Sequence, residues 1–222
     1  EVDGVVKVKG SDPFAWHESS VFWREMEHQV PGIRKIHIVG GEPLLIERHY
    51  DFLGHLIREK RAPRVILEYT SNISTIPKRA FDLWKNFQEV RLGASIDGVG
   101  QVNEYIRFPS KWSAIEKNLD LIDQADGNLK VWITTTVQIY NILHLTDFLR
   151  WKIEKGYQRI NSSMKAPFLT LHPLHAPSHF SIKILPKSAK TLVTDKFRDF
   201  FADWFLPHVD SLHLPADTKI NW

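Results

Sequence analysis

Residues 34–43 read Arg-Lys-Ile-His-Ile-Val-Gly-Gly-Glu-Pro, and this stretch carries the features on which the fold prediction rests. Its first six residues are rich in β-branched side chains, which is typical of a strand. The glycine pair and the proline predict a turn that ends this strand. Tyr50, Leu53 and Ile57 then follow at helical spacing. A strand, a turn and an amphipathic helix in this order form the repeating unit of a parallel α/β fold.

The same unit recurs along the chain. Further strands are predicted at residues 64–69, 89–96 and 129–137, with a weaker one at 168–171. Between them, apolar stripes at helical spacing predict helices; their members are Ala80, Leu83, Trp84 and Phe87, then Ile115, Leu119 and Ile122, then Leu145, Phe148, Leu149 and Ile153. We therefore predict the α/β class, with parallel strands joined by crossover helices.

Helix boundaries follow from local signals. Pro77 suits a first helical turn, Ser113 with Glu116 fits a capping box, and Gly156 marks a helix end. The first regular element is predicted to be a helix at residues 19–29. A leading crossover helix implies that its own strand lies upstream, unless residues 5–8 supply a short substitute. We expect the upstream strand to be missing from this sequence.

The rest of the chain indicates one domain over residues 1–222, with residues 187–222 as a helical extension that includes a predicted helix at 193–205. The net charge is +3, no cysteine is present and no run of eighteen apolar residues occurs. The basic residues at 58–64 are interpreted as a solvated helix end, so we expect neither nucleic-acid nor membrane binding. The amino terminus lacks the apolar core of a secretory signal, and we expect a cytoplasmic protein. Without cysteine, the chain itself makes no disulfide, thiolate zinc site or iron–sulfur ligation.

Each predicted strand ends in small or polar residues. These endings are Gly40-Gly41-Glu42-Pro43, Thr70-Ser71-Asn72, Ser95-Ile96-Asp97-Gly98, and Thr134 to Gln138 with Asn141. The carboxyl ends of parallel strands meet at one edge of a sheet, where α/β barrels build their ligand sites. The sequence therefore predicts one site at this edge.

Each ending taken alone has an ordinary structural interpretation. Residues 40–43 also suit a plain turn, and residues 70–72 are more often capping and turn residues than ligands. Asp97 would serve as a general base or be satisfied by neighbouring backbone amides. Arg107 lies among apolar neighbours and needs a partner, either a ligand carboxylate or Glu104.

In combination, four segments resemble the radical S-adenosylmethionine superfamily, and among its members most closely the bacterial twitch-domain enzymes. The segments are residues 36–45, 95–98, 103–107 and 135–141, within a resemblance that runs from about residue 16 to about residue 186. The resemblance implies a partial (β/α)6 barrel. It also implies a first strand followed by a CxxxCxxC loop, whose thiolates hold a 4Fe-4S cluster to which S-adenosylmethionine (AdoMet) binds.

The resemblance further implies an electron donor for the cluster, cleavage of AdoMet to a 5′-deoxyadenosyl radical, and hydrogen abstraction from a peptide or small metabolite that the sequence does not identify. It assigns residues to the parts of AdoMet. The amino group falls to Gly40, Gly41, Glu42 and Pro43, the carboxylate to Ser95 and Arg107, ribose or substrate to Asn72, Asp97 and Gln138, and adenine to the backbone of Thr136 to Ile139 with Val137 or Ile139 against its face.

The sequence departs from this family in having no cysteine. One explanation is a fragment that lacks the first strand and its cluster loop, and this is our expectation, because one deletion explains both absences. Such a fragment is expected to be inactive alone. The alternative is a cysteine-free relative that binds a ligand or partner. A third interpretation takes His172, His175 and His179 as a metal site in a hydrolase-like barrel.

Overall fold

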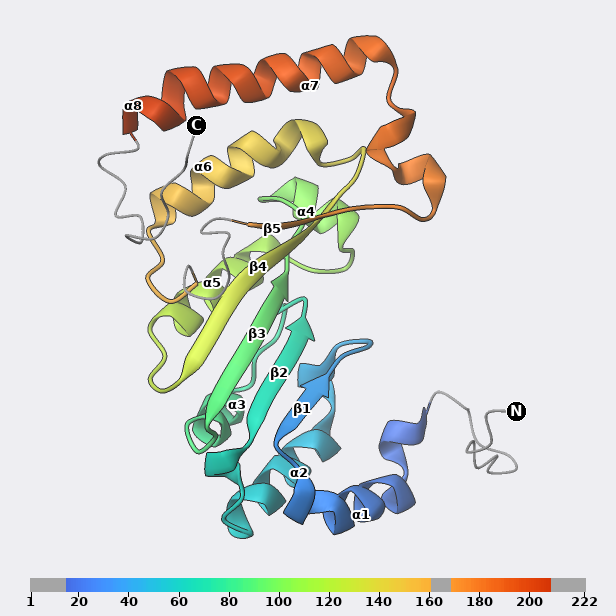
Figure 1. The fold of residues 1–222 in the computed structure, drawn as a ribbon, viewed down its shortest axis with the longest axis vertical. Coiled ribbons are helices and arrows are strands. Elements are labelled where there is room, and N and C mark those ends of the chain that lie inside the picture. Colours follow the sequence, from blue (N-terminus) through green and yellow to red (C-terminus); the bar gives the residue numbers. More distant parts are fainter. Residues whose placement is uncertain (1–14, 161–168, 209–222) are drawn as a thin grey trace.

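The computed structural model describes residues 15–160 and 169–208 (Figure 1). Its centre is a five-stranded sheet in the order β1-β2-β3-β4-β5, and every neighbouring pair is parallel. The strands are β1 Lys35–Ile38, β2 Ile66–Ser71, β3 Glu89–Ser95, β4 Leu129–Val137 and β5 Thr170–Pro173. The predicted class, α/β with a parallel sheet, is confirmed.

The α-helices are α1 Ser20–Gln29, α2 Glu47–Arg58, α3 Lys78–Trp84, α4 Gln101–Ile106, α5 Trp112–Asp123, α6 Leu145–Lys155, α7 Lys187–Asp199 and α8 Leu206–His208, with a π-helix at Phe200–Phe205 between the last two. Short 3-10 turns lie at Ala15–Glu18, Val30–Gly32, Pro43–Leu45, Ala62–Arg64, Ile142–His144, Ser178–Phe180 and Ile182–Ile184. In Figure 1, α2, α3 and α5 lie behind the sheet, whereas α6 and α7 stack near the end of the sheet at which β4 and β5 finish. Within the described residues, no helix combines the length and apolarity needed to span a membrane.

The sequence-based boundaries agree with the structure in most places. The strand predicted at 129–137 has those bounds, and Gly156 ends α6 with φ of 62°. The capping box predicted for Ser113 and Glu116 is wrong, because α5 already begins at Trp112. The backbone N–H of Trp112 donates to the Glu104 carboxylate at 2.8 Å. The last helix starts at 187, earlier than predicted. The predicted residues 5–8 and 168 lie outside the described part of the chain.

The sheet has one apolar and one polar face. On β3, Val90, Leu92 and Ala94 are at most 1% exposed and pack against the helices, while the alternate residues face the other way. Strand β4 alternates in the same manner. The core therefore lies between the sheet and the helices behind it. The opposite face, which is turned towards the viewer in Figure 1, is called the open face below.

A buried chain of hydrogen bonds joins α2 to β2 and α3. The His49 Nδ1 atom lies 2.9 Å from the Ile46 carbonyl oxygen, which only accepts, so we assign the ring proton to Nδ1. The Tyr69 hydroxyl then donates to His49 Nε2 at 3.2 Å and accepts from Trp84 Nε1 at 3.3 Å. Burial lowers the pKa of His49 to about 4. The network therefore contains a neutral histidine.

Candidate functional site

The turn after β1 depends on its glycine pair. Gly40 and Gly41 have φ of 92° and 53°, which is left-handed backbone that favours glycine. A Cβ atom at either position would meet nothing within 4 Å, so the backbone angle and not the space requires glycine. Pro43 is buried behind the pair, and the Tyr50 hydroxyl donates to the Leu44 carbonyl at 2.8 Å. Helix α2 thus fixes the turn while the glycines stay exposed.

The Glu42 carboxylate joins the turns after β1 and β2. It accepts from the Ser71 hydroxyl at 2.6 Å, from the Asn72 backbone N–H at 2.9 Å and from the Leu44 N–H at 3.3 Å. Ser71 Oγ in turn accepts from the Ile73 N–H at 2.9 Å. A carboxylate has about four acceptor positions, so roughly one remains for a ligand. The two turns therefore form one unit.

Replacing Glu42 with glutamine is expected to lower the free energy of unfolding by about 1–3 kcal/mol, the usual range when buried partners are left unsatisfied. The new amide group places donors against the Ser71 hydroxyl or the Asn72 N–H. Urea unfolding measures the change. The control is Glu47→Gln on α2, whose side chain is 73% exposed. An equal effect of the two substitutions would contradict this role of Glu42.

Asp97 is the centre of a second group. It is 2% exposed, its Oδ2 lies 2.8 Å from Arg107 Nε, and its Oδ1 accepts from the Thr136 N–H at 2.7 Å. Its own N–H donates to Asn103 Oδ1 at 2.9 Å. The partner of Arg107 within the chain is therefore Asp97 and not Glu104, whose carboxylate contacts residues 111 and 112.

Asn141 ties the turn after β4 to the same group. Its side-chain amide donates to the carbonyls of Asp97 and Thr136, both at 2.9 Å, and its Oδ1 accepts from the Gln138 N–H at 2.8 Å. The Ile139 N–H donates to the Phe180 carbonyl at 3.0 Å. Several main-chain groups in the segment predicted to lie beside adenine are thus paired within the chain.

The remaining predicted residues fall in different surroundings. Ser95 pairs in register with Thr134 on the open face. Val137 is 5% exposed and packs with Ile142 and Leu145 in a small apolar cluster. The Val137 side chain therefore contributes to packing. The strand endings form two groups at one rim: the Glu42 group with Ser71 and Asn72, and the Asp97 group with Asn103, Arg107, Thr136 and Asn141.

His144 contacts the turn that follows β3 and carries Asp97, and the sequence analysis did not identify it. Its Nε2 accepts from the Val99 N–H at 3.1 Å, and its Nδ1 lies 3.7 Å from Asp147. Burial lowers the pKa of His144. A Cβ atom on Gly98 would lie 2.9 Å from Val102 Cγ1 and 3.1 Å from His144 Cδ2, so a larger residue there would force these side chains to shift. Asn103 was not assigned to the site from the sequence, although it lies in the segment 103–107 that carries the resemblance.

The histidine interpretation finds no support in the described residues. His172, His175 and His179 are all exposed, and within residues 15–160 and 169–208 no group of three or more potential metal-ligating His, Cys, Asp or Glu residues is found.

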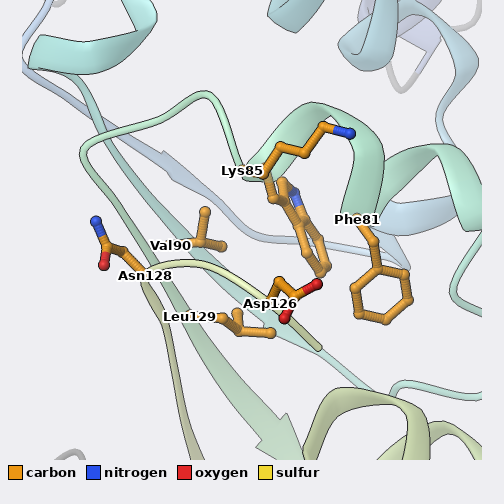
Figure 2. Close-up of a pocket in the computed structure, with 7 residues that line it drawn as sticks. Phe81, Lys85, Val90, Asp126, Asn128 and Leu129 are labelled. Carbon is orange, nitrogen blue, oxygen red and sulfur yellow. The ribbon is translucent and has the colours of Figure 1, made fainter. Parts of the chain in front are cut away.

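Two pockets of the described chain lie away from the rim. Figure 2 shows a small one of about 10 Å³ between the end of α3 and the starts of β3 and β4, where Phe81, Lys85 and Leu129 are among the lining residues. That volume suits about one water molecule. A broader groove of about 460 Å³ lies beside the ends of α1 and α2. The rim is a candidate site because of its polar groups.

Comparison with known proteins identifies the fold. No family model and no curated protein matches the sequence. The structure is similar to native anSMEcpe with bound AdoMet, at a TM-score of 0.55 and 14% identity over 86% of this chain and 52% of that chain. It is also similar to Streptococcus suis SuiB bound to S-adenosylmethionine, at a TM-score of 0.51 and 12% identity over 82% of this chain and 40% of that one.

A third similar structure is SuiB bound to the precursor peptide SuiA, with a TM-score of 0.53, 13% identity, and coverage of 82% of this chain and 39% of that chain. At sequence identities this low, the structural similarity establishes a shared fold and nothing more. The class that the fold defines is therefore a parallel α/β domain of the kind present in these structures, two of which contain bound AdoMet. The chain spans about half, or less, of the chains that it matches.

Proposed function

We propose that this chain supplies part of the AdoMet-binding domain of a radical S-adenosylmethionine enzyme. The observation that carries the proposal is that chains solved with AdoMet share its fold, while its rim motifs resemble that superfamily. In this proposal the domain is a partial (β/α)6 barrel of the twitch-domain type. Its first strand and cluster loop lie outside the present sequence, and residues 187–222 extend it.

The proposed contacts to the amino group and the carboxylate of AdoMet use groups that remain available at the rim. Gly40 and Gly41 are exposed, and Glu42 keeps about one acceptor position for the ammonium group. Arg107 contacts Asp97 through Nε, which leaves its terminal amino groups for a carboxylate, together with Ser95. Asp97 then acts by orienting Arg107. The residues proposed for ribose, substrate and adenine are Asn72, Thr136, Val137 and Gln138.

A 4Fe-4S cluster does not fit the residues present, because the sequence contains no cysteine to ligate it. In the enzyme the cluster would supply the electron that cleaves AdoMet, with its thiolates contributed from elsewhere in the protein. A CxxxCxxC segment encoded ahead of residue 1 is therefore expected. Its absence from the reading frame would favour the alternative, a cysteine-free binding relative, which the present composition also allows.

A peptide is the substrate class that we favour. One structure with this fold, SuiB, was solved with its precursor peptide. Two side chains of the proposed site, those of Ser95 and Thr136, face the open side of the sheet. A small metabolite is the other class that the resemblance implies.

Binding of AdoMet to this chain tests the proposal, and isothermal titration calorimetry measures it. We expect saturable binding that S-adenosylhomocysteine displaces and ATP does not. Arg107→Ala and Glu42→Ala should each weaken binding by about 1–3 kcal/mol, as for a lost charge-assisted contact. Arg150→Ala, on the exposed side of α6, is the control. Absence of saturable binding, or unchanged affinity in both site variants, would remove the proposed site.

A further inference from the structure

The segment after β4 holds the main chain of the turn after β3 at two points. The Asn141 side-chain amide donates to the Asp97 carbonyl at 2.9 Å, and His144 Nε2 accepts from the Val99 N–H at 3.1 Å. The carboxylate that pairs with Arg107 belongs to Asp97, in the same short turn. The orientation of that carboxylate therefore depends on both contacts.

Only the histidine contact can be lost by protonation. Because His144 Nε2 accepts from a backbone N–H, we assign the proton of the neutral ring to Nδ1, which lies 3.7 Å from the Asp147 carboxylate. The side chain of His144 is 26% exposed, so solvent can protonate it. Protonation places an N–H on Nε2 that faces the N–H of Val99. The neutral ring supports the turn, and the charged ring does not.

Helix α7 places a charge close to this histidine. Lys196 Nζ lies 2.8 Å from Asp147 Oδ2, the oxygen that also lies nearest His144 Nδ1. Apolar side chains of α7 pack against the small cluster that includes Ile142, two residues before the histidine. Burial lowers the pKa of His144, Asp147 raises it and Lys196 lowers it. In the described part of the chain, the charged side chains that act on the ring are thus Asp147 of α6 and Lys196 of α7.

We propose that His144 is a positioning residue for the Asp97–Arg107 pair of the proposed AdoMet site, and that α7 tunes it through Lys196 and Asp147. This role rests on the proposed function and adds a regulation of the same site. The sign follows from the hydrogen bond. The neutral ring prevails above the pKa of His144 and is lost as the pH falls through that value, so AdoMet affinity falls on acidification.

The pH dependence of AdoMet affinity tests the role of His144, and isothermal titration calorimetry measures it. Between pH 5 and 7 the carboxylate and ammonium groups of AdoMet keep their charges. We expect wild-type affinity to fall about three- to tenfold towards pH 5, as for the loss of one hydrogen bond. His144→Gln offers Val99 an amide oxygen that does not titrate, so it should keep the affinity at pH 7 and lose the pH dependence. His144→Leu should be weak at every pH, whereas His28→Gln, at an exposed position on α1, should keep the wild-type curve.

Two further variants test the contribution of α7. Lys196→Met removes a positive charge near the ring, so it should move the midpoint of the pH dependence to higher pH. Asp147→Asn removes the negative charge and should move the midpoint to lower pH. Lys187→Met, at an exposed position at the start of α7, is the control and should leave the midpoint unchanged. A purely structural role of these side chains would change the affinity equally at every pH.

Nuclear magnetic resonance follows the same link without ligand. The signals of the His144 ring, the Val99 amide and Arg107 Nε–H should titrate together, with a midpoint below the ordinary histidine value of about 6.5. Circular dichroism at each pH establishes folding, and His144→Gln carries the test if His144→Leu does not fold. Wild-type affinity that is constant between pH 5 and 7, or a pH dependence that His144→Gln retains, would overturn the proposal. Signals that titrate together in a chain that does not bind AdoMet would reject the proposed function alone.

Discussion

Replacing Asp97 with alanine is expected to lower the free energy of unfolding by about 3 kcal/mol, the lower end of the range for breaking a buried ion pair. The lower end applies because the Arg107 side chain is 24% exposed, so water solvates its charge once the Asp97 carboxylate is removed. The Thr136 N–H, which donates to Asp97 at 2.7 Å, also loses its acceptor. Urea unfolding followed by circular dichroism measures the change.

Two further variants make the Asp97 prediction specific. Asp97→Asn keeps an acceptor for Thr136 and removes the charge, so its effect should lie between those of the wild type and Asp97→Ala. Asp82→Ala removes a carboxylate that is 60% exposed and pairs with Lys85 at 3.5 Å, and it should cost less than about 1 kcal/mol. If Asp97→Ala were as mild as Asp82→Ala, Asp97 would not organise the rim.

Lowering the pH from 7 to 4 is expected to cost about 3 kcal/mol of stability through His49 alone. Its pKa falls from 6.5 in the unfolded chain to about 4 in the folded protein, because burial disfavours the charged ring. Between pH 6.5 and about pH 4, His49 is protonated in the unfolded chain and neutral in the folded protein. The contribution of His49 is therefore fully present above pH 6.5 and is lost as the pH falls towards 4. The hydrogen bond that Nε2 accepts from Tyr69 favours the same neutral form, whereas the one to the Ile46 carbonyl raises the pKa and offsets part of the effect of burial.

The free energy of unfolding of the wild type and of His49→Gln, measured at several pH values, isolates this contribution. The variant is expected to be less stable at pH 7 and to lose less stability on acidification. His55→Gln, a half-buried position on the same helix, is the control and should keep the wild-type pH dependence. Parallel curves for His49→Gln and the wild type would show that His49 is charged, or paired differently, in the folded protein.

Local sequence patterns determined the architecture. Alternation of apolar residues located β4 at its observed bounds, and helical spacing identified the faces that cover the sheet. The convergence of polar residues at one rim also followed, because parallel strands place their carboxyl ends together. These properties depend on neighbours within a few residues, and periodicity reports them directly.

Only the tertiary structure decided which polar groups meet. Glu42 binds Ser71 and Asn72, which follow it by 29 and 30 residues, and Trp132 packs beside Gly93 on the adjacent strand. The nearby carboxylate of Glu104 was an equally reasonable partner for Arg107 until the turn after β3 placed Asp97 beside it. The strand register and the geometry of the crossover connections set these distances. Neither can be read from the spacing of residues along the chain.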